Sequence, residues 1–323
     1  MTPENIDVLV IGAGVCGLTT ALCLAESGRT VLVRTRELPT DTSSHASGAI
    51  WGPLLAVHDR ILMWSHQTLS ILKPLATQRG TGVRLVSGME ASRSVCRPHD
   101  WLTGVDDFEL CSATELPIGF LCGWRYTAPV VDMPTYLDYL LRRFIQAGGQ
   151  IERASVNSIH SVRGMAPVVV NCTGSGAREA VPDTDVVPAR GQLVVADNPG
   201  VHRFFLETSE DSPELTYFLP QGDQIILGGT LEHGRSDTTP RADTAEAIIS
   251  RCAMIEPALA QVRVRSHRVG LRPLRPQVRV EQVNVGGQHV IHNYGHGGGG
   301  VSLSWGCALE VLSIVELLAP ALF

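Results

Sequence analysis

The N-terminal residues alternate between short apolar runs and a helical repeat of apolar positions. Residues 8–11 form an uninterrupted apolar run, short enough for a strand that is buried on both faces. Apolar side chains then recur at helical spacing over residues 18–25, and Gly28 follows where that helix would end. A second short apolar run occupies residues 30–33. The pattern therefore predicts a strand, a turn, a helix and a second buried strand.

Residues 132–149 predict another helix with clear ends. Asp132 can cap its N-terminus, Pro134 suits its first turn, and Gly148 and Gly149 follow its last turn. Its apolar positions form one stripe that we expect to be buried, namely Tyr136, Leu137, Leu140, Leu141, Phe144 and Ile145.

The middle of the chain returns to strand patterns. Residues 168–170 are apolar and lead into a glycine turn, which predicts a strand beside the N-terminal ones. Residues 190–198 and 215–230 have patterns typical of an antiparallel sheet. The segment between them, residues 199–214, is acidic toward its end, so we expect a surface loop or a short lid.

The last third of the chain predicts two helices. Residues 243–259 have a helical pattern, and residues 289–318 read as a strand, a glycine turn and a final helix. Strand-and-glycine-turn units thus occur near the start, in the middle and near the end of the chain, and the antiparallel part lies between them.

Composition and charge exclude several classes of protein. The chain has 26 basic and 32 acidic residues and a net charge of −6, without a long basic run, so we expect neither nucleic acid nor an anionic membrane as a partner. No apolar run was expected to reach the roughly 18 residues of a membrane helix, and the N-terminus lacks the features of a signal peptide. The 8 cysteines include no C-x-x-C pair, so we expect no metal site and mostly buried thiols in a reducing, cytoplasmic compartment.

A G-x-G-x-x-G motif lies between the first predicted strand and the first helix. Gly12 allows a tight turn, Gly14 allows the backbone to approach a pyrophosphate, and Gly17 lets the helix pack on the strand. The N-terminus of the helix then faces the phosphates. The motif in this context predicts dinucleotide binding.

The identity of the dinucleotide depends on the end of the second strand. An acidic residue there usually binds a ribose, but the chain has Thr35 and Arg36 before Glu37. Glu37 is either that acid, displaced along the chain, or a surface charge. A further glycine cluster, residues 297–300, lies near the C-terminus. A ligand that touches both ends of the chain is long and enclosed, which favours FAD over NAD.

The four consecutive glycines of residues 297–300 need a reason, because ordering glycine costs backbone entropy. Either the chain turns sharply there or a ligand lies against bare backbone. His292 and His296 flank the cluster, and histidines in such places more often fix a loop by hydrogen bonds than act as a catalytic base.

Seven motifs along the chain together carry a resemblance. These are IGAGVCGLTTAL, DMPTYL, VVNCTG, RGQ, YFLPQGD with LGGT, GLRPLRPQVRVE and HNYGHGGGGVSLSWGCA, in this order. They are similar to motifs of the D-amino-acid oxidase family, and the resemblance covers nearly the whole chain. It implies FAD-dependent oxidative deamination of D-amino acids to 2-oxo acids, ammonia and hydrogen peroxide, by hydride transfer from the substrate α-carbon to flavin N5, with O2 as the second substrate. A flavin oxidase of the same fold that acts on glycine, sarcosine or a biosynthetic amine is the alternative.

The resemblance implies three substrate-binding residues. Arg272 matches the arginine that binds the substrate carboxylate, Tyr217 matches a tyrosine beside it, and Gly298 matches a glycine whose carbonyl accepts the substrate amine. A second tyrosine of longer-lidded relatives is replaced by Pro213. Arg235 follows LGGT and is either a surface arginine or a contact for an acidic substrate side chain.

The same matching implies a larger set of cofactor-binding positions. They comprise the N-terminal turn, the end of the second strand, the hydroxyl-rich loop after it, two positions in the middle of the chain and the C-terminal glycine loop. The positions are Gly12, Ala13, Gly14, Val15, Cys16, Gly17, Thr35, Arg36, Thr42, Ser43, Ser44, Gly48, Ala49, Ile50, Val156, Thr173, Gly297, Gly298, Gly300, Val301 and Ser302.

These observations predict an α/β protein of two interleaved parts. An FAD-binding Rossmann-like domain is assembled from the discontinuous segments 1–50, 132–178 and 264–323. A substrate domain of α+β type, built on an antiparallel sheet, is inserted as segments 51–131 and 179–263. The expected partners are a D-amino acid and O2, and the sequence leaves a homodimer open.

Overall fold

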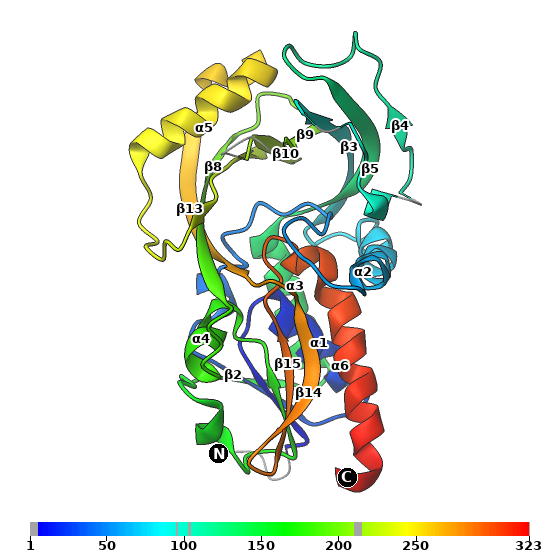
Figure 1. The fold of residues 1–323 in the computed structure, drawn as a ribbon, viewed down its shortest axis with the longest axis vertical. Coiled ribbons are helices and arrows are strands. Elements are labelled where there is room, and N and C mark those ends of the chain that lie inside the picture. Colours follow the sequence, from blue (N-terminus) through cyan, green and yellow to red (C-terminus); the bar gives the residue numbers. More distant parts are fainter. Residues whose placement is uncertain (1–5, 95, 103–104, 210–214, 323) are drawn as a thin grey trace.

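Two sheets form two lobes of an elongated molecule (Figure 1). The computed structural model describes residues 6–94, 96–102, 105–209 and 215–322. The lower lobe in Figure 1 contains a mainly parallel sheet, and the upper lobe contains a mainly antiparallel sheet. The mixed α/β architecture with both kinds of sheet confirms the predicted fold class.

The six-stranded sheet is assembled from three separate parts of the chain. Its order is β14 (Arg279–Val285), β15 (Gln288–Tyr294), β7 (Val168–Asn171), β1 (Val8–Ile11), β2 (Val31–Thr35) and β6 (Gln150–Arg153). The strands from β15 to β6 are parallel, and β14 is antiparallel to β15. The four residues of β1 are buried, as are those of β7, because both strands have neighbours on each side and covered faces.

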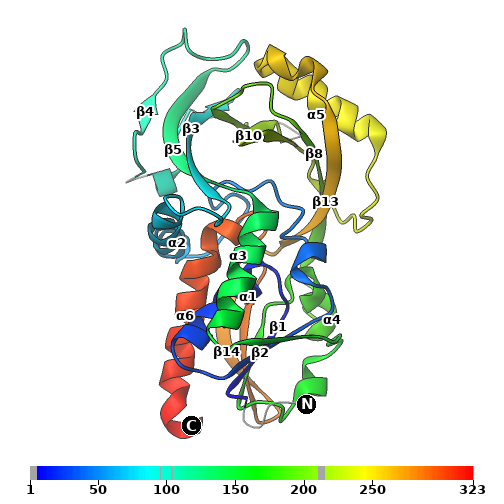
Figure 2. The ribbon, with the colours of Figure 1, turned by 180° about the vertical axis from the view of Figure 1, so that it is seen from behind.

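Side-chain alternation gives this sheet two apolar faces. Val8 and Val10 pack with the helix layer, whereas Leu9 and Ile11 pack on the other side with the short 3-10 helix η3 (Ile159–Val162). The helix layer contains α1 (Val15–Glu26), α3 (Met133–Gln146) and α6 (Gly300–Leu322), and α1 contacts both of the others (Figure 2).

The helix α3 begins and ends close to the predicted residues, but its buried stripe is narrower. Tyr136, Leu137, Leu140 and Phe144 are buried. Leu141 is only partly buried and Ile145 is 47% exposed, which corrects the expectation for these two residues. A helix packed on one side against α1 covers only part of its circumference, so a position at the edge of the stripe faces solvent.

The nine-stranded sheet forms the upper lobe. Its order is β12 (Glu232–His233), β8 (Val187–Asp197), β11 (Gln224–Gly228), β10 (Tyr217–Gln221), β9 (Phe204–Glu207), β3 (Val83–Ser92), β5 (Cys122–Val131) and β4 (Glu109–Leu110), and β13 (Val264–Leu274) pairs with β8. The pair β3 and β9 is parallel, and the other pairs are antiparallel. The helix α5 (Ala242–Ile255) covers one face of this sheet, and α2 (Ile61–Leu75) packs against α6 below it.

Two segments differ from the sequence predictions. Residues 204–207 lie in the segment expected to be a loop or lid, yet they form β9, because Phe204, Phe205 and Leu206 supply a buried apolar run. Residues 264–274 were grouped with the cofactor-binding part, yet they form β13 in the antiparallel sheet. We therefore propose residue 275 as the domain boundary at that point. Pro213 lies outside the described residues.

The C-terminal helix corrects the expectation of no membrane-length apolar segment. Among the described residues, Gly300–Pro320 is the one helix long and apolar enough to span a membrane by length and composition. About half of its residues (56%) are buried inside the protein, against α1 and α2. The core helix of a folded domain meets the same criteria, so this helix is weak evidence for a membrane.

Two of the eight cysteines are paired. Cys96 and Cys122 form a disulfide, while Cys16, Cys23, Cys111, Cys172, Cys252 and Cys307 are free thiols. This pair, separated by 26 residues, could not be predicted from the sequence, because the pairing depends on where β5 begins after the segment that connects it to β3.

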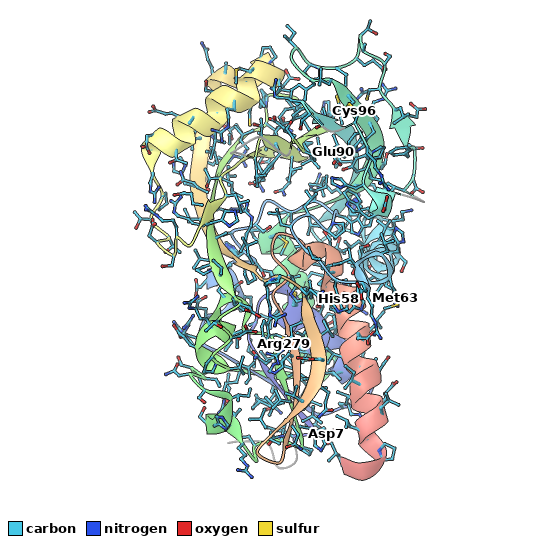
Figure 3. The ribbon with its side chains drawn as sticks, viewed as in Figure 1. Asp7, His58, Met63, Glu90, Cys96 and Arg279 are labelled. Carbon is cyan, nitrogen blue, oxygen red and sulfur yellow. A yellow bond between two sulfur atoms is a disulfide. The ribbon has the colours of Figure 1, made fainter. Side chains whose placement is uncertain are left out.

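A buried carboxylate lies near the end of β3, a few residues before Cys96. Glu90 on β3 is fully buried, and the Tyr126 hydroxyl donates to its Oε2 at 2.8 Å (Figure 3). His99 Nε2 lies 3.3 Å from Oε1, and the His99 ring stacks on Trp101 at 5.3 Å between centroids. The hydrogen bond to Glu90 raises the pKa of His99 above its ordinary 6.5.

This pair predicts a pH-dependent contribution to stability. Because the folded pKa of His99 is raised, its contribution is complete below about pH 6.5 and is lost as pH rises through the folded pKa. We expect His99→Gln to lower the free energy of unfolding at pH 6 and to remove this part of the pH dependence. Urea unfolding of both proteins from pH 5.5 to 8.5 measures it, and parallel pH profiles would contradict the prediction.

Candidate functional site

A cavity of about 690 Å³ lies between the two sheets and is lined from both. Residues of the β1–α1 turn line it from the parallel sheet, and Tyr217 of β10 and Arg272 of β13 line it from the antiparallel sheet. The loop between β2 and α2 joins the lobes, because Ile50 forms a bridge with Val130 and the Trp51 amide donates to the Pro129 carbonyl at 2.8 Å. The cavity therefore depends on the packing of the two lobes.

The β1–α1 turn presents the N-terminus of α1 to the cavity. Gly14 is the N-cap residue and has no side chain to cap the helix. Ser44, from the loop after β2, supplies the acceptor instead, since its Oγ accepts from the Val15 amide at 3.0 Å. A Cβ on Gly17 would overlap the Gly12 carbonyl oxygen, so Gly17 sets how closely the helix approaches the strand.

Most hydroxyls of the loop after β2 already have partners in the protein. Ser43 Oγ accepts from the Leu271 amide at 3.2 Å, Thr42 Oγ1 donates to the Pro39 carbonyl at 2.8 Å, and Thr35 Oγ1 donates to the Glu37 carbonyl at 2.7 Å. These bonds fix the loop, so its contribution to a bound phosphate would come chiefly from backbone amides.

The C-terminal glycine loop packs backbone to backbone against residues 53–56. Gly297 has a φ of +54°, and a Cβ there would overlap the Leu55 carbonyl oxygen. A Cβ on Gly298 would lie 3.0 Å from the Leu54 carbonyl oxygen. The glycines thus serve both a turn and a close approach, but the approach is to the protein's own loop as well as to the cavity.

The guanidinium of Arg272 lies over a glycine of the neighbouring strand. Arg272 is half-buried, and its Nη1 donates to the Thr230 carbonyl at 2.9 Å. A Cβ on Gly191 of β8 would overlap this nitrogen. The bare backbone at Gly191 therefore makes room for the guanidinium at the edge of the cavity.

Tyr217 lies over a glycine in the same manner. It pairs with Gly228 across β10 and β11, and a Cβ on Gly228 would overlap its ring. Burial raises the pKa of the Tyr217 hydroxyl, and the charge of Arg272 opposes this shift. The phenol is therefore a neutral donor beside a cation.

Strand alternation supplies an apolar wall next to these two residues. Leu206 is opposite Tyr217 in the ladder, and Leu219 shares its side of β10. Leu215 precedes the strand, and all three leucines line the cavity. Leu54 and Leu55, from the loop that contacts Gly298, also line the cavity.

Two buried polar atoms that line the cavity lack a protein partner. Ser175 Oγ and Asn293 Oδ1 make no hydrogen bond within the described structure, although Asn293 Nδ2 donates to Thr20 Oγ1 at 3.0 Å. Buried polar groups are usually bonded, so these atoms fit a polar ligand that extends along the cavity. A dinucleotide with hydroxyls and phosphates meets this requirement, and the residues present therefore fit FAD.

The structure brings nearly all of the predicted site residues to this one cavity. Tyr217, Arg272 and Gly298 line it, together with the predicted cofactor positions Gly12, Ala13, Gly14, Val15, Cys16, Thr35, Arg36, Thr42, Ser43, Ser44, Gly48, Ala49, Ile50, Val156, Thr173, Gly297, Gly300 and Val301. Within the described structure, Gly17 and Ser302 are outside the lining. The Ser302 hydroxyl instead accepts from the Gly52 amide and donates to the Gly52 carbonyl, both at 2.9 Å.

The histidines near the glycine loop have structural surroundings. His296 is buried with Nδ1 3.5 Å from Cys16 Sγ, and burial lowers its pKa to about 4. Burial also lowers the pKa of His292 to about 4, and its Nδ1 lies 3.3 Å from Asn171 Nδ2. Both are neutral near pH 7, and neither lies in an arrangement with a carboxylate that would make it a strong base.

Sequence reasoning missed several residues of the site. Gly191 in RGQ and Gly228 in LGGT are not among the predicted site residues, although glycine inside a strand often marks the close approach of another group. Leu54, Leu55, Leu206, Ser175 and Asn293 carried no signal, because their role depends on which strands and loops meet. Arg235 does not line the cavity among the described residues; it is 58% exposed and lies 3.5 Å from Asp237.

Comparison with known proteins agrees with this geometry. Residues 7–313 match the family described as FAD dependent oxidoreductase (DAO). The chain is 45% identical to a D-amino-acid oxidase of Rubrobacter xylanophilus over 95% of this chain and 94% of that protein, and 42% identical to a D-amino-acid oxidase of Streptomyces coelicolor over 96% and 97%. A glycine oxidase structure from Geobacillus kaustophilus superposes with a TM-score of 0.81 at 19% identity, over 98% of each chain. The chain belongs to the DAO family of FAD-dependent oxidoreductases. FAD is therefore its cofactor.

The glycine under Arg272 gives a direct test of the geometry. We expect Gly191→Ala to displace the guanidinium and to lower kcat/KM for the amino-acid substrate roughly 10- to 100-fold, since a misplacement of about 1 Å can cost that much. The flavin content should stay at the wild-type level. Steady-state kinetics and the flavin-to-protein absorbance ratio measure both, and unchanged kcat/KM would show that the guanidinium has another place to bind.

Proposed function

We propose that this protein is a D-amino-acid oxidase in which Arg272 and Tyr217 hold the substrate carboxylate. The observation that carries the proposal is that this cation and its neutral donor line the same cavity as the N-terminus of α1. The family membership and the named relatives support the same activity.

The chain's own residues orient the substrate. The guanidinium of Arg272 has donors beyond the one bonded to Thr230, and a carboxylate accepts such donors through two parallel bonds. The Gly298 carbonyl is the proposed acceptor of the substrate amine. These contacts set the α-carbon at a fixed angle, and well-held geometry is worth roughly 7–11 kcal/mol. Bound FAD would supply the hydride acceptor for oxidation of the amino acid to an imino acid, which water hydrolyses to the 2-oxo acid and ammonia, and the electrons that reduce O2 to hydrogen peroxide.

The lining favours neutral, apolar substrate side chains. Leu54, Leu55, Leu206 and Leu215 form the wall beside Arg272. Arg36 and Arg272 are the arginines among the described lining residues, and Arg36 follows β2 in the part of the chain expected to bind the adenosine. An acidic side chain would therefore enter an apolar chamber without a second cation.

The deciding experiment combines cofactor release with a substrate panel. Denatured protein should release a yellow chromophore that chromatographs as FAD. A peroxide assay should give the highest kcat/KM with apolar D-amino acids such as D-leucine and D-valine, and little activity with D-aspartate, L-amino acids, glycine or sarcosine. Highest activity with glycine or sarcosine would favour the alternative amine oxidase, and highest activity with D-aspartate would overturn the proposed side-chain preference.

We further propose that the enzyme works in the cytoplasm without a membrane or nucleic-acid partner, and that two copies of the chain can form a homodimer. The acidic net charge of −6 supports the absence of a nucleic-acid partner.

A further inference from the structure

The RGQ motif at residues 190–192 places a fully buried arginine outside the cavity. Arg190 has 0% exposure, and its guanidinium is bonded to one loop. Nη1 lies 2.6 Å from Glu232 Oε1, Nε donates to the Asp237 carbonyl at 3.1 Å, and Nη2 donates to the Thr239 carbonyl at 2.7 Å. A buried cation needs such complete pairing, and here the pairing joins β8 to residues 232–239.

Gln192, two residues further along β8, fastens both ends of the same loop. Its Oε1 accepts from Arg190 Nη2 and from the Arg241 amide, both at 2.9 Å, and its Nε2 donates to the Arg241 carbonyl at 2.7 Å. Its own amide donates to Thr230 Oγ1 at 2.9 Å. Besides the short β12–β8 ladder, residues 230–241 are therefore held at their start, middle and end by two side chains and one amide of β8. We call this arrangement of Arg190 and Gln192 the loop clamp.

Two arginines keep the Glu232 carboxylate of this arrangement ionised. Glu232 also receives Arg241 Nη1 at 2.9 Å. Burial acts to raise the pKa of Glu232, but the bonds from Arg190 and Arg241 hold it below its ordinary value. The carboxylate therefore stays ionised and paired at neutral pH.

The clamped loop carries a group that touches the substrate anchor. The Thr230 carbonyl accepts from Arg272 Nη1 at 2.9 Å, and Thr238 lines the cavity. Gln192 lines the cavity, whereas Arg190 is not among the described lining residues and so does not reach the substrate.

We propose that Arg190 and Gln192 are positioning residues, which fix the loop 230–241 and, through the Thr230 carbonyl, set the orientation of the Arg272 guanidinium. The inference rests on the proposed role of Arg272 as the carboxylate anchor. A guanidinium fork binds a carboxylate well only when its plane is fixed. Release of the loop would let the plane rotate without removing either the charge or the cofactor.

The test is a double-mutant cycle with Arg190→Lys and Arg272→Ala. Lysine keeps the buried charge but cannot reach three acceptors in the geometry of a guanidinium. We expect Arg190→Lys alone to lower kcat/KM for D-leucine roughly 10- to 100-fold, and to weaken binding of propionate, a carboxylate without an amine, measured by calorimetry. In the Arg272→Ala background the same change should alter kcat/KM by less than about twofold, because residues that act through one another are not additive. Flavin content should be unchanged.

Arg265 provides a matched control on the same two strands. It lies on β13 and pairs with Asp197 of β8 at 2.5 Å and with Asp223 at 3.0 Å, away from the described cavity lining. Arg265→Lys should leave kcat/KM and propionate binding unchanged. Equal losses in the Arg190 and Arg265 variants would overturn the proposal.

Further outcomes separate this inference from the proposed function. Additive effects in the cycle would show that Arg190 acts on overall stability and would refute its action through Arg272. If Arg190→Lys does not fold, Glu232→Gln removes the carboxylate that pairs with Arg190 and Arg241, from a position outside the described cavity lining, and it must show the same non-additivity. Wild-type kcat/KM in Arg272→Ala alone would refute the carboxylate anchor itself.

Discussion

Arg272→Ala is expected to lower kcat/KM for D-amino acids by roughly 10²–10⁴-fold, since loss of one partner of a desolvated charged pair costs about 3–5 kcal/mol. The carboxylate would lose its charge-assisted bonds, and the α-carbon would lose its fixed angle to the cofactor. Arg272→Lys should recover only part of the loss, because an ammonium cannot reproduce the guanidinium fork. Steady-state peroxide kinetics with D-leucine and D-alanine measure both variants.

A simple amine serves as the internal control for this prediction. It has no carboxylate, so any slow turnover of it should change little between wild type and Arg272→Ala. Flavin content should also match wild type, because Arg272 bonds the Thr230 carbonyl rather than the β1–α1 turn. A variant that lost FAD but regained full kcat/KM when saturated with it would make Arg272 a cofactor-binding residue.

Gly17→Val is expected to abolish FAD binding. A Cβ at this position would overlap the Gly12 carbonyl oxygen and lie 2.9 Å from its carbon, and backbone atoms cannot move aside as a side chain can. The helix α1 would be forced from β1, which would remove the N-terminus of the helix from its place at the cavity. We also expect a loss of about 1–3 kcal/mol in unfolding free energy from overpacking. Flavin content after purification in excess FAD and urea unfolding measure the two effects.

Ser27→Val is the matched control, since it puts the same β-branched side chain at the exposed end of α1. It should retain FAD. If Gly17→Val also retains FAD with wild-type affinity, the close contact between Gly12 and Gly17 is not needed for the cofactor, and the reading of this motif would have to be revised.

Local sequence patterns predicted much of the lobe that contains the parallel sheet. A short apolar run before G-x-G-x-x-G has few arrangements that bury it, so β1, α1 and β2 followed from periodicity and glycine spacing. Family motifs in the middle and near the end of the chain indicated Tyr217, Arg272 and Gly298, and all three line the cavity. These are local signals, because each depends on residues within one turn or one strand.

Other features of the molecule depend on contacts between segments that are distant in the sequence, so only tertiary packing fixes them. Residues 204–207 contain a short apolar run, but it becomes a strand because β3 and β10 offer pairing sites on both sides. Ser44 caps α1 from a loop 29 residues away, Gly191 makes room for Arg272 from a neighbouring strand, and Cys96 meets Cys122 only where β5 begins. Propensity and periodicity indicate the conformation of a single segment. Caps, glycine contacts and cross-links depend on which segments meet, and these meetings are fixed only when the whole chain packs.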